Sequence, residues 1–156
     1  MDKLNKRNVF EMMDYRADAG FSAMAQIEAY WEALRGSRLM PKRSEIDPRG
    51  IETALEYTFV LERMAIGMAR LRIAGSHLNN LMGMEVRGMP LTSFITPNGR
   101  AQMGDILEEV FQRPSACEIR LSTEVGRDKP AMDARMLLLP LKSDLGDVSR
   151  VLGCFI

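Results

Sequence analysis

Along residues 57–156 the hydrophobic pattern changes its period twice, and this order of periods limits the fold more than any other feature. Two segments of strand-like composition, 57–62 and 68–73, precede a helical block, and three more, 116–125, 132–141 and 148–156, follow it. Strands joined by short turns pair as antiparallel hairpins, whereas helices grouped mid-chain pack across a sheet face. The sequence therefore predicts an α+β fold with a five-stranded antiparallel sheet and helices on one face.

Glycine and proline residues divide the central block into short helices. Ser76 is a suitable N-cap for a helix that ends at Gly83, and a single helical turn is predicted over 91–95. A longer helix is predicted over 99–112, because apolar residues recur there at spacings of three and four. We expect that apolar stripe to face the sheet.

An amphipathic N-terminal helix is predicted over 21–36, between a flexible tail over 1–20 and the main domain over 39–156. Apolar residues recur along it at spacings of three and four, which gives one wide stripe. The stripe consists of Phe21, Met24, Ile27, Tyr30, Trp31 and Leu34. Two interpretations are open: the stripe covers the core of its own domain, or it pairs with the same helix in a second subunit as the interface of a homodimer.

The charge of the chain is balanced, with 21 Lys and Arg residues against 21 Asp and Glu residues. No overall field favours nucleic acid, so we predict no nucleic-acid partner. No apolar run approaches the length of about 20 residues that a membrane span needs, and the charged first residues do not resemble a secretory signal. Two cysteines, Cys117 and Cys154, are too few for a disulfide scaffold. These features together predict a cytoplasmic protein.

Catalysis and metal binding often use histidine and cysteine, and this chain has only one histidine and two cysteines. The single histidine, His77, would have to serve any Ser-His-Asp or Cys-His site, and no nucleophile motif flanks it. Cys117 and Cys154 lack the spacing of metal ligands, and no glycine-rich loop with a lysine follows a strand. We therefore predict no catalytic residue, no metal site and no enzyme, with a small enzyme on a similar frame as the less favoured alternative.

Three local motifs carry a resemblance to a known family. The segment Pro41-Lys42-Arg43-Ser44-Glu45-Ile46-Asp47-Pro48 follows the pattern P-x-R-x-x-I-D-P, and Arg72-Ile73-Ala74-Gly75 follows R-L-x-G with isoleucine at the second position. Gly83, Gly88 and Leu91 match a G-x-x-x-x-G-x-x-L stretch. With the order of strands and helices, these motifs resemble a bacterial stand-alone subgroup of the PAS domain family, over about three quarters of the chain.

The resemblance implies a sensory or docking module that binds small ligands, dimerises and passes a change of shape to a signalling partner. In haem-binding PAS relatives the ligating histidine usually lies on the long helix, and here 99–112 contains none. Light-sensing relatives that bind flavin carry a cysteine in an N-C-R-F-L motif on a mid-domain helix, whereas Cys117 and Cys154 fall on predicted strands. We therefore predict no cofactor, neither haem nor flavin.

Thirteen methionines suggest adaptable packing, because the methionine side chain fills irregular space and is common at pliable binding surfaces. Ordinary core filling is the other explanation of these methionines, and it is the favoured one. The candidate ligand pocket between sheet and helices consists of Leu71, Ile73, Leu81, Met82, Phe94, Met103 and Leu107, with His77 or Asn80 as polar groups. The predicted function is a non-catalytic sensory PAS module that binds a small apolar or amphipathic ligand, a protein partner, or both. The alternative is a structural adaptor or dimerisation domain without a ligand.

Overall fold

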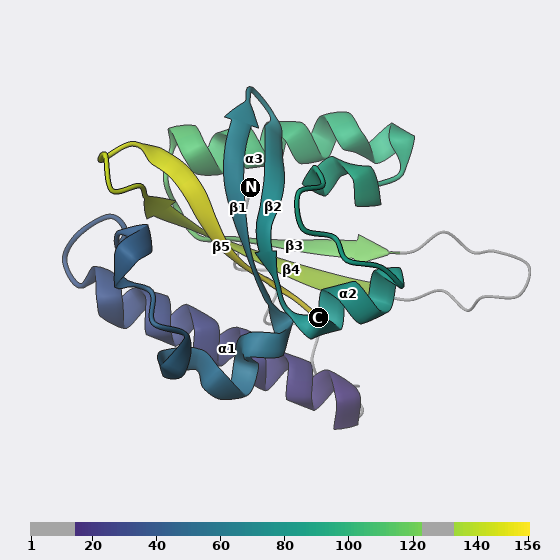
Figure 1. The fold of residues 1–156 in the computed structure, drawn as a ribbon, viewed down its shortest axis with the longest axis horizontal. Helices are drawn as coiled ribbons and strands as arrows, with labels where there is room; N and C mark the ends of the chain where they lie inside the picture. Colours follow the sequence, from purple (N-terminus) through teal and green to yellow (C-terminus); the bar gives the residue numbers. More distant parts are fainter. Residues whose placement is uncertain (1–14, 123–132) are drawn as a thin grey trace, which may run out of the picture.

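In the computed structural model, which describes residues 15–122 and 133–156, one antiparallel sheet lies between two groups of helices (Figure 1). The sheet has the strand order β2-β1-β5-β4-β3, so the first strand in the sequence pairs with the last one at the centre of the sheet. The strands are β1 (Thr58–Ala65), β2 (Met68–Ala74), β3 (Cys117–Ser122), β4 (Asp133–Lys142) and β5 (Val148–Phe155). The predicted five-stranded antiparallel sheet is confirmed. The part of the predicted 116–125 and 132–141 strands that falls in 123–132 lies outside the described residues.

A bulge in the β1–β2 hairpin decides which face of the sheet each side chain occupies. Leu61 is paired with Leu71 and Val60 with Ile73, so Arg72 is an extra residue on β2. Regular alternation would place Leu71 and Ile73 on the same face. The bulge instead leaves Leu71 in the core, while Ile73 is 50% exposed on the opposite face. The prediction that Ile73 lines an internal pocket is therefore wrong.

One face of the sheet is covered by the predicted central block of helices. The block comprises α2 (Ser76–Met82), η4 (Leu91–Phe94), η5 (Pro97–Gly99) and α3 (Arg100–Gln112). Gly83 ends α2 in the left-handed conformation, with a φ of 71°. The predicted stripe of α3 is buried at Met103, Leu107, Val110 and Phe111, and packs on Phe59 and other residues of the sheet.

The opposite face is covered by α1 (Tyr15–Arg35), together with η2 (Arg43–Glu45) and η3 (Pro48–Tyr57) (Figure 1). The first residue of α1 is Tyr15, so residues 15–20, predicted as part of the tail, are helical, and 1–14 lie outside the described residues. The η3 helix begins as its sequence indicates, with Pro48 in the first turn and the Asp47 side chain accepting from the Arg49 backbone N–H.

The N-terminal helix buries its stripe within its own chain. Met24, Ile27 and Trp31 form a second hydrophobic core with side chains of η3, β4 and β5. The indole Nε1 of Trp31 donates a 2.9 Å hydrogen bond to the carbonyl oxygen of Pro140 on β4. Tyr30 and Leu34 are half-buried, and nothing is described of the Phe21 side chain. Of the two interpretations of the stripe, the structure supports the first, and Met24, Ile27 and Trp31 are not free to pair with a second subunit.

One ion pair ties α3 to the β1–β2 hairpin. Glu108 accepts from the Arg63 guanidinium at 2.6 Å and from the Gly67 backbone N–H at 2.9 Å. These hydrogen bonds, that from Arg63 above all, lower the pKa of Glu108 from its ordinary 4.5 to about 2. The glutamate therefore remains charged in the folded domain under conditions that protonate it in the unfolded chain.

This difference predicts a loss of stability in acid. The contribution of Glu108 is complete above about pH 4.5 and declines as the pH falls toward about 2, because the unfolded chain then binds the proton first. We expect Glu108→Gln to lower the free energy of unfolding by about 1–3 kcal/mol near neutral pH, and by much less near pH 3. Urea unfolding at both pH values measures this, with Glu109→Gln on the same helix as control. An equal loss at both pH values would contradict the assignment.

Candidate functional site

A cavity of about 720 Å³ lies between the inner face of the sheet and the helices α2, η4 and α3. Its wall is formed from the sheet side by Ile119, Leu121, Ala134, Met136 and Phe155, on β3, β4 and β5. The helical side contributes Leu78, Leu81, Met82, Leu91, Phe94, Ile95, Met103 and Ile106. A space of this size and composition is in the range of pockets that hold small organic molecules.

The polar side chains of the cavity are found at its rim. Gln102, Arg120, Ser122 and Thr96 are all exposed, whereas Met103, Ile119 and Met136 are buried in the wall. Arg120 is on β3, the edge strand of the sheet, and no carboxylate of a described residue forms a salt bridge with it. The interior is apolar, which suits a ligand with an apolar body. Arg120 lies between Ile119 and Leu121, which face the cavity, so its side chain leaves the edge strand on the opposite face.

Four of the predicted pocket residues line this cavity, namely Leu81, Met82, Phe94 and Met103. Leu71 and Leu107 are fully buried in the same core but do not reach its wall. Both side chains fill the core itself, Leu71 from β2 and Leu107 from α3. The prediction placed the sheet side of the wall on β2, at Leu71 and Ile73. It missed the residues of β3, β4 and β5 that form that side, although the alternation around Ile119 and Leu121 provided a signal for them.

The two predicted polar groups lie elsewhere. His77 packs between aromatic rings, with its centroid 4.9 Å from that of Tyr57 and 6.5 Å from that of Phe155. Asn80 is exposed, and its neighbour Asn79 has the structural role, because its side-chain oxygen accepts from the Val86 backbone N–H at 3.0 Å. Neither His77 nor Asn80 lines the cavity, whose polar lining residues are Thr96, Gln102, Arg120 and Ser122.

The cysteines lie apart from the cavity. Cys154 is on the face of β5 that meets α1, and burial raises the pKa of its thiol to about 12. Cys117 is buried on β3 below the α3 helix and does not line the cavity either. Neither thiol is placed to react with a molecule bound there, and burial in an apolar environment is typical of a structural cysteine.

The described lining contains no His, Cys, Asp or Glu. Within residues 15–122 and 133–156, no group of three such residues is arranged to hold a metal ion. In the same part of the chain, none of the helices combines the length and the apolar character that crossing a membrane requires.

Solved structures of similar fold include two light-oxygen-voltage proteins. One is a light-oxygen-voltage domain studied with a flavin analogue, at a TM-score of 0.52 and 14% identity, over 69% of this chain and 81% of that chain. The other is an RNA-binding light-oxygen-voltage receptor, at a TM-score of 0.51 and 17% identity, over 79% of this chain and 37% of that chain. The TM-scores show a similar fold, and at identities this low the likeness extends to the fold alone. No curated protein sequence matches the chain closely enough to indicate a relationship.

A sequence model of the PAS domain matches residues 20–156, which includes every strand of the sheet, both sets of helices and most of α1. The match extends the resemblance seen in the three motifs to nearly the whole length of the chain. On the combined grounds of sequence and fold, this chain belongs to the PAS domain family.

Proposed function

We propose that this sensory signalling module detects a small amphipathic molecule, which it binds in the cavity between the sheet and α3. The observation that carries the proposal is the cavity itself, about 720 Å³ of mainly apolar space with Arg120 at its rim. A PAS domain is typically a sensory module, and this one has a space in which a signal molecule fits. The motifs at Pro41, Arg72 and Gly83 support placing it in the bacterial subgroup named above.

The chemistry of the lining selects the class of ligand. Burial of an alkyl chain against Met103, Met136 and Phe155 stabilises a complex by about 25 cal/mol for each Å² of apolar surface removed from water. We propose that Arg120, on the edge strand β3, reaches around that edge to a carboxylate at the other end of the chain, because a planar guanidinium binds such a group with two parallel hydrogen bonds. A fatty-acid-like molecule satisfies both conditions, and decanoate serves as the probe.

Filling the cavity is expected to abolish binding. Ala134 lies on the cavity wall, and Ala134→Phe places a ring in the space that the alkyl chain would occupy. Isothermal titration calorimetry should show saturable decanoate binding to the wild type and none to this variant. The matched control is Ala101→Phe, because Ala101 is exposed on α3 outside the wall. Equal binding to all three proteins would reject the cavity as the site.

Removing the cation at the rim is expected to distinguish charged from neutral ligands. Arg120→Gln should raise the dissociation constant for decanoate about tenfold, which corresponds to one charge-assisted hydrogen bond. The same variant should bind decanol as well as the wild type does, because the apolar wall is unchanged. If the variant weakens decanol equally, Arg120 supports the wall and does not recognise the head group.

The module is non-catalytic in this proposal, because the described cavity lining supplies no His, Cys, Asp or Glu as acid, base or nucleophile. We further propose that it works in the cytoplasm without a bound cofactor. A visible absorption band of the purified protein would contradict this proposal, because it would show that the protein binds a chromophore such as flavin.

We also propose a homodimer or a separate protein as the partner that receives the signal. Because α1 buries its stripe, such contacts would use other surfaces. If this chain binds a partner but no ligand, it is a structural adaptor or dimerisation domain instead.

A further inference from the structure

A second concave site lies on the outer face of the sheet, away from the cavity and beside the part that α1 covers. It is a groove of about 550 Å³ over β1, β2 and the start of β5. Five arginines from four separate segments converge on it. They are Arg43 of η2, Arg70 and Arg72 of β2, Arg87 of the loop after α2, and Arg150 of β5.

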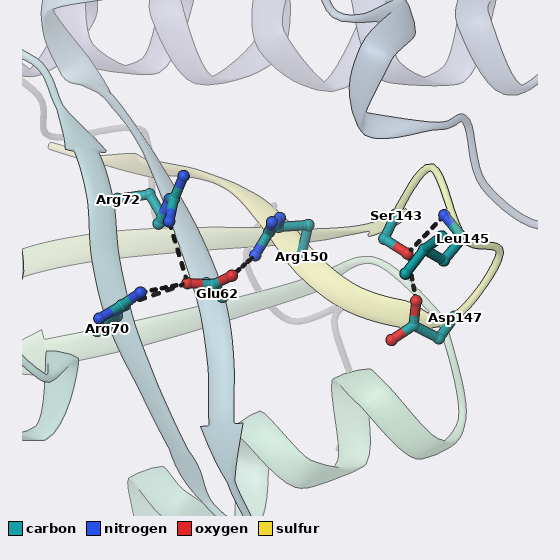
Figure 2. A network of polar contacts seen from close by, with 7 residues as sticks. All are labelled: Glu62, Arg70, Arg72, Ser143, Leu145, Asp147 and Arg150. Carbon is teal, nitrogen blue, oxygen red and sulfur yellow. Dashed lines mark hydrogen bonds and ion pairs between the residues drawn. The ribbon is translucent and has the colours of Figure 1, made fainter.

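One carboxylate organises three of these arginines, as Figure 2 shows. Glu62 of β1 is 2.9 Å from a terminal nitrogen of Arg70 and 3.4 Å from one of Arg72, and its second oxygen accepts from Arg150. The hydrogen bond from Arg150 is the main cause of the lowered pKa of Glu62, which keeps this carboxylate charged. Its side chain is only 19% exposed, so it holds the arginines from beneath.

The arginines offer more hydrogen-bond donors than the protein uses. Each guanidinium has five N–H donors, and Glu62 engages only some of those on its three partners. Arg43 and Arg87 form no salt bridge with any described residue. Asp144 is the one acidic residue of the described lining, so five cations face two carboxylates, Glu62 included. The groove therefore has excess positive charge and unused donors.

The motifs that carried the family resemblance meet at this groove. Arg43 comes from the first motif, Arg72 and Ile73 from the second, and Gly88 from the third. Arg72 pairs with Glu62 within the sheet and extends into the groove, with 50% of its side chain exposed.

We propose that this groove binds a small molecule bearing a phosphate or diphosphate group. Several guanidinium forks around one small space suit an anion whose charge is concentrated and whose oxygens accept paired hydrogen bonds. Val60 and Ile73 provide an apolar wall for the organic part of such a molecule. The described lining has no aromatic side chain on which bases could stack, which favours a small ligand over single-stranded RNA.

The test uses pyrophosphate as the probe and isothermal titration calorimetry as the measurement. The wild type should bind pyrophosphate saturably, and more weakly as salt is added. Arg43→Ala and Arg87→Ala should each raise the dissociation constant about tenfold, because each removes charge-assisted hydrogen bonds to the anion. Since neither arginine has an ion-pair partner among the described residues, both variants should keep the melting temperature of the wild type.

Two further variants separate a built site from general attraction to charge. Arg113→Ala removes an exposed arginine at the end of α3, outside the groove, and should leave pyrophosphate binding unchanged. Ala134→Phe, which blocks the cavity, should also bind pyrophosphate normally, so that failure of either site is recognised separately.

Several results would overturn the proposal. No heat of binding at millimolar pyrophosphate would do so, as would an equal loss in Arg113→Ala. A third would be tight binding of a uridine oligonucleotide that pyrophosphate does not displace, since that result would assign the groove to RNA.

Discussion

Replacing Trp31 with alanine is expected to lower the free energy of unfolding by about 3–5 kcal/mol, the usual cost of truncating a buried aromatic side chain to alanine. The indole is 4% exposed and packs among side chains of η3, β4 and β5. Its Nε1–H also bonds the Pro140 carbonyl, which would lose that partner. Urea unfolding followed by circular dichroism measures the change.

Two controls give this result its meaning. Trp31→Phe keeps most of the ring volume and loses the hydrogen bond, so its cost should be about 1–3 kcal/mol. Leu39→Ala, at a side chain that is 70% exposed, should change stability by less than about 0.5 kcal/mol. If Trp31→Ala left stability unchanged while converting a dimer into a monomer, the stripe of α1 would belong to a subunit interface after all.

The substitution Gly75→Ala is expected to lower the free energy of unfolding by about 3 kcal/mol or more, at least as much as adding a methyl group to a well-packed core. A Cβ there would lie 2.4 Å from the carbonyl oxygen of Glu56 and 2.7 Å from that of Leu55. Both are backbone atoms, which cannot move aside as a side chain does. The backbone N–H of Gly75 is meanwhile fixed by a 2.7 Å hydrogen bond to the Thr58 carbonyl oxygen.

The matched control for Gly75→Ala is Gly36→Ala. Gly36 has a φ of 57°, but a Cβ there would meet nothing within 4 Å. Its substitution should cost only about 1–2 kcal/mol, the penalty of the left-handed conformation. Gly75 has an ordinary extended conformation that alanine adopts freely, so its cost is steric alone. Thermal unfolding of both variants gives the comparison, and a smaller loss at Gly75 than at Gly36 would contradict the close approach.

The sheet and the central helices were predictable because their signals are local. Alternation marked the strands, and Gly83 marked the end of α2, whereas the N-cap of that helix is Gly75 and not the predicted Ser76. The family was predictable for the same reason, because the motifs and the order of the elements are both patterns along the sequence.

The arrangement of faces was less predictable, because it depends on contacts between distant segments. Nothing local to β2 shows that Arg72 forms a bulge, yet this bulge moves Ile73 to the outer face. The stripe of α1 likewise shows that the helix is buried against something, and only the folded chain shows that β4 and β5 are its partners.

The prediction of the candidate site was correct only for the wall that the helices form. The spacing of apolar residues along α2 and α3 indicates which side of each helix faces the sheet, and this correctly predicted Leu81, Met82 and Met103. The strands that complete the cavity come from the last third of the chain, and their inner face is decided by strand order. Arg120 was missed because an arginine that alternates with apolar residues is ordinarily a solvent-facing side chain on a strand.

The central claim is that the cavity between the sheet and α3 receives an amphipathic signal molecule. The most direct measurement is an NMR titration of isotope-labelled protein with decanoate, in which every backbone amide is observed. The account predicts saturable shifts concentrated at Phe94, Met103, Ile119 and Met136, and their loss in Ala134→Phe. Shifts confined to the outer face of the sheet, or no saturable shift at any cavity residue, would contradict it.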